Sequence, residues 1–374
     1  MYAEPVNTLS PELFSLWEDL HGSDGGRTGP FLHPAYARAA GVVRRDVEVG
    51  IITRDDEVIG FLPFQRSPLG VGGPVGSRLC DLAGAVVKPD TCWDPLTFAN
   101  QAGLRTLRLP NVPASMGSFG PFQGDGGMAP LLDLAGGFDA YRRASLDSGS
   151  SFLRQLERKG RKLERDLGPR RFEWHTTDDS VFDTLLSWKA AQRSMTRTPN
   201  ILRLRWARAL LERLRQVHDD GFEGVLSALY VGDTLAAAHF GIRTRHVLHY
   251  WIPAYNHELS TYSPGLLALM DLARAAADRG IQRIDLGSGE ERYKVRAATG
   301  VQDMRLATVN TSAAFRALTT MLDHTRTWSQ GSRLGHVMRR AGRSMVRGSY
   351  LLQSAVASTA VIRGRESVRA SAQR

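Results

Sequence analysis

The segment IDLGSGEERYK, residues 284–294, brings several reactive side-chain types together within a few positions. An apolar run ends at the carboxylate of Asp285, two glycines and an acidic pair follow, and a phenol and an ammonium group stand side by side at Tyr293 and Lys294. A carboxylate or a phenol can exchange a proton with a substrate, and an ammonium group can bind an anion. The pattern predicts a strand that ends at a functional site.

A second segment, STYSPGLLALMDLARAAADRG, predicts a helix whose start could bind an anion. Ser263 is the expected N-cap, Pro264 the first helical residue, and Gly280 closes the helix. Free N–H groups at a helix start, beside a glycine such as Gly265 that permits close approach, can hold a phosphate or pyrophosphate. The alternative interpretation is that Ser-Pro-Gly is only a favourable way to begin a helix.

Other polar and aromatic residues are weaker candidates. His239 lies in AAAHFG, where strand alternation can place it in a cleft as a base, although a lone histidine among alanines also suits a structural role. Trp188, Lys189 and Gln192 lie on one predicted helix, and Trp188 and Gln192 share a face that could bind a sugar or nucleotide. The alternative for Trp188 is packing in the core.

The histidines and cysteines do not predict a metal site or a disulfide framework. His246 and His249 are three apart on a strand and therefore point to opposite faces. Cys80 and Cys92 form no C-x-x-C pair, so we expect a reducing, cytoplasmic location. The start of the chain has no signal-peptide pattern, and no stretch approaches 18 uninterrupted apolar residues.

The elements that must position these residues follow an α/β pattern. Helices are expected from PELFSLWEDL, from the strongly basic SGSSFLRQLERKGRKLERDL and from DDSVFDTLLSWKAAQRSM. VGIITRDDEVIGFLPFQ and LSALYVGDTLAAAHFGI both consist of an apolar strand, an acidic turn and an apolar strand, and HVLHYWIPAYN predicts a further strand. This weak internal repeat suggests a duplicated α/β module.

Length and charge divide the chain further. Its 374 residues suggest two domains and an appendage, which we place at residues 1–147, 148–311 and 312–374. The net charge of +10 is concentrated in 312–374, which holds eleven arginines, no lysine, one aspartate and one glutamate. The open interpretations for this tail are a helix on an anionic membrane surface, contact with nucleic acid, and a solvated, disordered segment.

The order of these segments resembles the GNAT acyltransferase superfamily. Further pieces are similar to its CelD/BcsL-like branch, linked to cellulose and other polysaccharide biosynthesis and itself similar to FemAB-type aminoacyltransferases. They are FLHPAYARAA, GFLPFQR, GGPVGSRLCDLAG and LLSWKAAQ, and with the two segments above they cover about residues 10 to 305. The superfamily's usual diphosphate signature is absent, and SPG stands in its place.

The resemblance implies tandem GNAT-like modules, each a mixed, mostly antiparallel twisted sheet flanked by helices. It implies an acyltransferase whose donor is acyl-coenzyme A, with acetyl as the expected acyl group, and which uses no metal. The donor would meet Ser263, Pro264 and Gly265, and backbone N–H groups of HYWIPA, which contains Trp251 and Ile252, would hold the thioester carbonyl.

For the reaction itself, the resemblance implies direct transfer to an amine or hydroxyl of a saccharide or other small acceptor. Tyr293 would protonate the leaving thiolate, and Asp81, like His239, is a candidate base that reaches the acceptor in the cleft between modules. Asp285 would shape the acceptor side, and Lys294 would pair with a phosphate or an acidic acceptor. Two alternatives stay open: a FemAB-like enzyme that uses charged tRNA, and a scaffold without catalysis.

Overall fold

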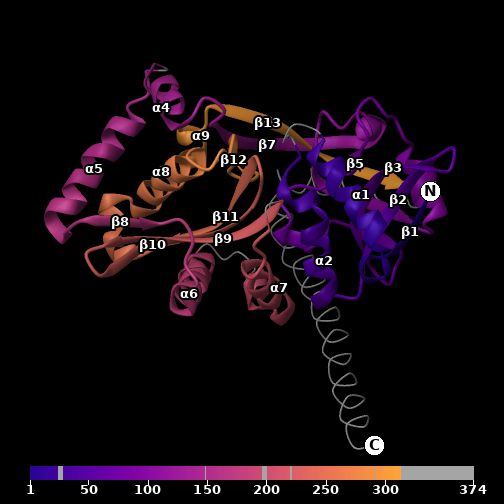
Figure 1. Ribbon diagram of the computed structural model, residues 1–374, viewed down its shortest axis with the longest axis horizontal. Coiled ribbons are helices and arrows are strands. Elements are labelled where there is room, and N and C mark those ends of the chain that lie inside the picture. Colours follow the sequence, from indigo (N-terminus) through magenta and orange to yellow (C-terminus); the bar gives the residue numbers. More distant parts are fainter. Residues whose placement is uncertain (24–27, 148, 196–199, 220, 290, 313–374) are drawn as a thin grey trace, which may run out of the picture. The chain divides into compact units, whose positions relative to one another are not determined.

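The computed structural model describes residues 1–23, 28–147, 149–195, 200–219, 221–289 and 291–312. Residues 1–309 form one compact unit, in which helices cover both faces of a long mixed sheet (Figure 1). The expectations for the basic tail fall on residues 313–374, outside the described part of the chain. Among the described residues, no helix has both the length and the apolar character needed to cross a membrane.

The elements alternate between helices and strands in both halves. The first half contains β1 (Tyr2–Pro5), η1 (Val6–Thr8), α1 (Pro11–Gly22), η2 (Pro30–Leu32), α2 (Pro34–Val43), β2 (Val47–Arg54), β3 (Glu57–Arg66), β4 (Val71–Gly73), η3 (Ser77–Leu79), β5 (Val86–Val87), α3 (Pro95–Gln101), β6 (Thr106–Pro113), η4 (Gly117–Phe122), β7 (Gln123–Asp133) and α4 (Phe138–Asp147). The second half contains α5 (Phe152–Leu167), β8 (Arg170–Glu173), α6 (Asp179–Met195), η5 (Ile201–Arg203), α7 (Arg205–Arg215), β9 (Phe222–Val231), β10 (Thr234–Thr244), β11 (Val247–Tyr255), η6 (His257–Tyr262), α8 (Pro264–Ala277), β12 (Arg283–Asp285), α9 (Arg292–Ala297) and β13 (Gly300–Asn310).

The sheet follows the order β1-β2-β3-β4-β6-β13-β7-β12-β11-β10-β9-β8, with β5 paired to β3. Antiparallel pairs predominate, and the parallel pairs β4–β6 and β11–β12 occupy matching places in the two halves. The predicted fold class, a mixed and mostly antiparallel sheet flanked by helices, is confirmed.

Each half contains the hairpin that the internal repeat predicts. In the first, β2 and β3 pair across a turn in which Asp55 and Asp56 adopt φ of 50° and 62°. In the second, β9 and β10 pair across a turn in which Gly232 has φ of 53°. Aspartate and glycine tolerate this left-handed backbone better than most residues, so the acidic turns fix where the chain reverses.

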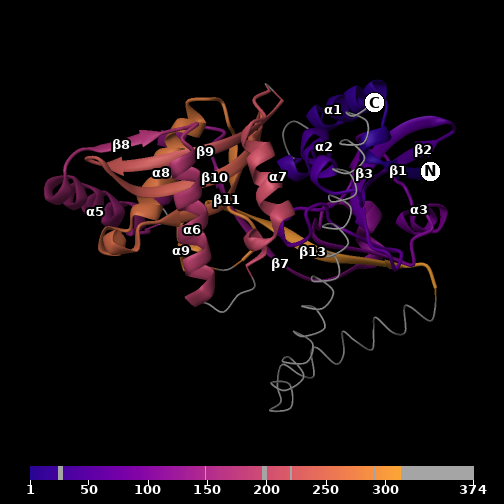
Figure 2. The same ribbon diagram turned by 90° about the horizontal axis from the view of Figure 1, so that it is seen from below.

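The two halves exchange strands at the centre of the sheet. β7 comes from the first half but pairs with β12 of the second, with Asp133 opposite Arg283. β13 comes from the end of the second half but lies between β7 and β6 of the first. Figures 1 and 2 show this strand pair running across both halves. The predicted boundary between residues 147 and 148 falls between α4 and α5 and stays a prediction.

Apolar side chains fill both faces of the second-half sheet. Helices α6 and α7 cover one face, and α8, with α4 and α5 outside it, covers the other (Figure 1). On the α6–α7 face the core continues into the first half through Trp17, Phe31 and Trp251, which belong to one buried cluster. The first helix begins as its sequence predicts, since the Ser10 hydroxyl accepts a hydrogen bond from the Leu13 N–H at 3.3 Å.

Candidate functional site

A buried imidazole joins the two halves of the protein. His249, on β11, is fully buried, and its Nε2 lies 3.0 Å from Oδ2 of Asp81, in the loop after η3. Its Nδ1 lies 3.5 Å from Oδ2 of Asp285, the last residue of β12, within ion-pair range but without hydrogen-bond geometry. The ring of Phe31 packs edge-on against His249, with centroids 4.8 Å apart. Residues from three distant parts of the sequence therefore meet at one point.

The two carboxylates control the charge of this imidazole. Burial by itself would lower the pKa of His249, but the negative charges of Asp285 and Asp81, with the hydrogen bond to Asp81, raise it to about 9. Burial would raise the pKa of Asp285, yet the His249 cation and the Gly287 N–H hold it below its usual value. Asp285 and His249 thus form a buried ion pair at neutral pH, while Asp81, with 33% of its side chain exposed, faces the solvent side.

The sheet opens directly beside this cluster. β11 and β12 run parallel over three residue pairs, and His249 opposite Asp285 is the last of them. After this pair the chain leaves β12 through Gly287, whose φ is 74° and whose missing Cβ would meet Asp81 Oδ2 at 2.9 Å. Beyond His249, β11 continues with Tyr250 and Trp251, and within the described residues its pairing with β12 does not extend to them.

Two lysines lie near the opening. Lys294 is buried in α9, where its Nζ donates to the carbonyl of Ser288 at 3.0 Å and lies 3.1 Å from Glu291. Lys189, on α6, donates to the carbonyl of Pro253 on β11 at 3.1 Å. Burial lowers the pKa of Lys189 to about 8, with further contributions from the positive charges of Arg193 and Lys294. The predicted turn around Tyr293 and Lys294 is thus a short helix in the structure.

The remaining predicted proton-transfer residues near the opening are His239 and Tyr293. His239, on β10, is buried, stacks on Tyr250 with centroids 4.4 Å apart, and has its Nδ1 3.3 Å from the Ser227 hydroxyl. Burial lowers the pKa of His239 to about 3, helped by the positive charge of His249, so its imidazole is neutral. Tyr293, on α9, is half-buried, and this partial burial together with the charges of Glu291 and Asp81 raises its pKa. Its phenol therefore holds its proton at neutral pH.

Helix α8 begins on the same side of β11. Ser263 precedes it in a left-handed conformation, with φ of 58°, and its hydroxyl does not cap the helix. That hydroxyl accepts instead from Nζ of Lys159 on α5 at 2.7 Å, which places a cation at the helix start. Pro264 is buried, and a Cβ on Gly265 would meet the Tyr255 ring at 3.2 Å. A positive charge at a helix N-terminus favours a bound anion.

Three predicted residues have structural contacts outside the opening. The Trp251 indole donates to the carbonyl of Leu79 at 2.8 Å and fastens β11 to the first half. Ile252 is buried in the same core cluster, so only its backbone could serve a ligand. Trp188 is half-buried against that cluster, and Gln192 is exposed one turn further along α6.

The structure thus gathers Asp81, Asp285, Tyr293, Lys294 and Lys189 around the opening, and it places Ser263, Pro264 and Gly265 at the adjoining helix start. Gln192 is exposed on α6. The sequence interpretation missed His249, which it considered only as a metal ligand. No local pattern in the sequence indicates its role, because its two carboxylate partners lie 168 positions before it and on another strand after it. The described residues contain no cluster of three histidine, cysteine or acidic side chains able to hold a metal ion.

Comparison with known proteins identifies a domain family for part of the chain. Residues 150–295 match the family model described as acetyltransferase (GNAT) domain. No curated protein matches the chain.

Solved structures share the fold at low identity. The C-terminal domain (DUF2156) of a putative lysylphosphatidylglycerol synthetase from Agrobacterium fabrum is 13% identical, with a TM-score of 0.51, covering 82% of this chain and 96% of that one. FemX is 12% identical, with a TM-score of 0.53, covering 81% and 97%. A conserved protein of unknown function from Bacteroides thetaiotaomicron is 9% identical, with a TM-score of 0.51, covering 79% and 97%. The GNAT resemblance is confirmed at the level of the fold and of the domain match.

Proposed function

We propose that the protein is a GNAT-type acyltransferase that moves an acyl group, most simply acetyl, from acyl-coenzyme A to an amine or hydroxyl acceptor. The observation that supports this proposal most directly is that β11 and β12 stop pairing after His249 and Asp285, beside the start of α8. Backbone N–H groups of β11 beyond this point could donate hydrogen bonds to the carbonyl oxygen of a thioester. The cation of Lys159 at the start of α8 could bind the diphosphate of the donor. The matched domain over residues 150–295 spans both features.

The surrounding side chains supply the proton transfers of a direct reaction. The acceptor nitrogen or oxygen attacks the thioester carbonyl carbon, the carbon–sulfur bond breaks, and an amide or ester forms with release of the thiol. The protonated phenol of Tyr293 would give its proton to the leaving sulfur, because its raised pKa keeps it in the acid form. Asp81 would take the proton of the acceptor, and backbone N–H groups of Trp251 and Ile252 would stabilise the carbonyl oxygen.

His249 would position the proposed base. Its Nε2 holds one oxygen of Asp81, and Asp285 fixes the imidazole from the other side. Lys294 and Lys189 would attract a negatively charged acceptor to the same opening through their positive charges. Their Nζ atoms lie beside it, where each donates to a backbone carbonyl. His239, neutral and enclosed, would support Tyr250 behind the donor strand.

The acceptor class rests on the sequence resemblance to CelD/BcsL-like proteins. We propose a saccharide or other small precursor of a polysaccharide as acceptor and a cytoplasmic site of action. The Arg-rich segment 312–374 would let the enzyme attach to an anionic membrane surface, because arginines near such a surface each add to the attraction.

A second candidate function, transfer from an aminoacyl donor, is supported by a separate observation. Helix α5 exposes Arg154, Arg158, Arg161, Lys162 and Arg165 at spacings that align them along one face, next to the Lys159 contact at the start of α8. A row of cations follows a phosphate backbone well, so charged tRNA is the alternative donor. The fold shared with FemX is consistent with this alternative.

Calorimetric titration with acetyl-coenzyme A tests the proposal. We expect binding by the wild type, loss of at least about ten-fold in affinity in Lys159→Met, which corresponds to ~1.4 kcal/mol, and loss in Gly265→Trp, where the ring would fill the helix start. Arg154→Met, an exposed cation on the same helix, is the matched control and should bind as the wild type does.

The same titration separates the alternatives. If neither acetyl- nor longer acyl-coenzyme A binds while circular dichroism shows a folded protein, the coenzyme A proposal is wrong. Salt-dependent binding of charged tRNA, weakened in the Arg154→Met and Arg158→Met variants, would then support the aminoacyl donor. Absence of both would support a scaffold without catalysis.

A further inference from the structure

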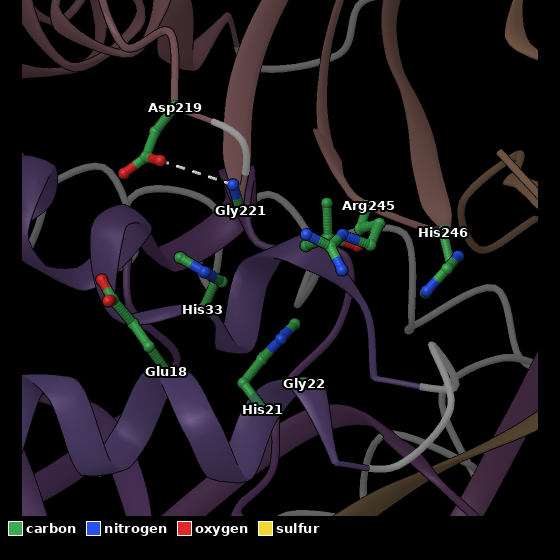
Figure 3. Close-up of a pocket in the computed structure, with 9 residues that line it drawn as sticks. Glu18, His21, Gly22, His33, Asp219, Gly221, Arg245 and His246 are labelled. Atoms are coloured by element: carbon green, nitrogen blue, oxygen red, sulfur yellow. Dashed lines mark hydrogen bonds between the residues drawn. The ribbon is translucent and has the colours of Figure 1, made fainter. Parts of the chain in front are cut away.

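A separate cavity of about 280 Å³ lies between the two halves, away from the opening of the sheet. Helix α1 and the residue after η2 line it from the first half, and the loop before β9 and the β10–β11 turn line it from the second (Figure 3). Its volume is just below the range of about 300–1,000 Å³ typical of small-molecule pockets. A small ligand therefore fits it better than a coenzyme.

A buried histidine offers an unused hydrogen-bond donor to this cavity. His33 is 5% exposed, stacks on Phe222 with centroids 5.1 Å apart, and caps α2 through its Nδ1, which accepts from the Ala35 N–H at 3.2 Å. This bond leaves the ring proton of the neutral imidazole on Nε2. In the described part of the chain, Nε2 has no hydrogen-bond partner, and it faces the backbone of Gly221 at the cavity.

Opposite charges line the cavity without meeting. Figure 3 shows Glu18 and Asp219 on one side, Arg245 and His246 on the other, and His33 between them. Among the described residues, neither Glu18 nor Arg245 makes a hydrogen bond or an ion pair. Partial burial and the charge of Asp219 raise the pKa of Glu18, and the charge of Arg38 partly opposes them. Each side of the cavity therefore presents charged groups that a ligand between them could bind.

We propose that this cavity binds a small zwitterion, an amino carboxylic acid, whose ammonium group lies between Glu18 and Asp219 and whose carboxylate meets Arg245 and the Nε2–H of His33. An ammonium group can donate to both carboxylates, and a guanidinium group binds a carboxylate with two parallel hydrogen bonds. A ligand with only one of the two charges would leave the other side of the cavity without a partner.

The cavity is connected to the proposed active site by a short segment. Two residues before His33, Phe31 contacts both His249, at 4.8 Å between ring centroids, and Trp251, at 5.2 Å. A ligand held by His33 would thus fix the segment that packs on the proposed catalytic cluster. The binding itself does not depend on the acyl-transfer proposal and is tested without it.

The test is a titration of the full-length protein with amino acids of increasing length: glycine, β-alanine, 4-aminobutyrate, 6-aminohexanoate and glycylglycine. We expect at least one to bind, and its N-acetyl derivative and its carboxamide to bind at least about ten-fold more weakly, equal to ~1.4 kcal/mol. Glu18→Gln and Arg245→Met should each weaken binding by a similar factor. Both side chains are at the surface, so the fold should persist.

Arg143→Met, at an exposed arginine on α4 to which no role is assigned, serves as the control and should leave the binding unchanged. Three results would overturn the proposal: no binding of any member at ~10 mM, a range that detects even weak ligands; equal binding of the N-acetyl or carboxamide forms; or unchanged binding in both cavity variants. Because the readout is affinity, an inactive or differently active enzyme does not affect the outcome.

Discussion

The charge of His249 makes a quantitative prediction about stability and pH. Its ordinary pKa of 6.5 is raised to about 9 in the folded protein by Asp285 and Asp81, against the effect of burial. A rise of this size corresponds to about 3 kcal/mol of folding free energy, at roughly 1.4 kcal/mol per pH unit. Because the pKa is raised on folding, this contribution is fully present below pH 6.5 and is lost as the pH rises to 9.

The assay is urea unfolding followed by tryptophan fluorescence at pH values from 6 to 9.5. Asp81→Asn removes one of the two charges, so the loss of stability between pH 6.5 and 9 should be smaller than in the wild type. Asp285→Asn should reduce it more, because Asp285 contributes more to the raised pKa of His249. Asp125→Asn, an exposed residue on β7, is the control and should follow the wild-type curve.

Taking differences between curves cancels the other titrating groups that the variants share. If Asp81→Asn and Asp285→Asn both track the wild type within about 0.5 kcal/mol, a typical margin for independent sites, then His249 is not held charged by these residues. The reasoning about the cluster would then be refuted, whatever the enzymatic activity of the variants.

Three further predictions concern single positions. Gly287→Ala should destabilise the protein by about 1–2 kcal/mol in urea unfolding, since φ is 74° there and the new Cβ would meet Asp81 Oδ2 at 2.9 Å; an unchanged midpoint would contradict the turn geometry. Ser10→Ala should cost about 1 kcal/mol in the same assay because the Leu13 N–H loses its partner, and Ser15→Ala, inside the helix, is its control. Lys189 should show half-maximal reductive methylation near pH 8 by mass spectrometry, and reactivity like that of exposed lysines would count against its burial.

The hairpins were predictable because their information is local. Alternating apolar residues and an acidic turn lie next to each other in the sequence, and the turn at Asp55 and Asp56 has the left-handed backbone that such residues tolerate. The α8 helix was predictable for the same reason, but its start was not fully so. The Ser263 hydroxyl is bound by Lys159, 104 positions earlier, and no local pattern indicates that contact.

The centre of the candidate site could not be predicted from patterns in the sequence. His249 and Asp81 are 168 positions apart, and their contact depends on how the two halves pack through Phe31 and Trp251. Asp81 itself was proposed from the family resemblance, and Asp285 from the end of its strand. The histidine between them carries no spacing signal, because its partners come from a loop and from another strand.

The exchange of β7 and β13 has a consequence for how the protein could be divided. Residues 150–295, the stretch that matches the acetyltransferase domain, include β12 but not β7, the strand that completes the sheet beside it. Expressed by itself, this stretch would leave the backbone donors and acceptors of β12 without partners along one side, an edge prone to self-association. Each half thus supplies a strand that completes the part of the sheet formed by the other half. If the gene were split, we expect working protein only when both fragments are made in the same cell.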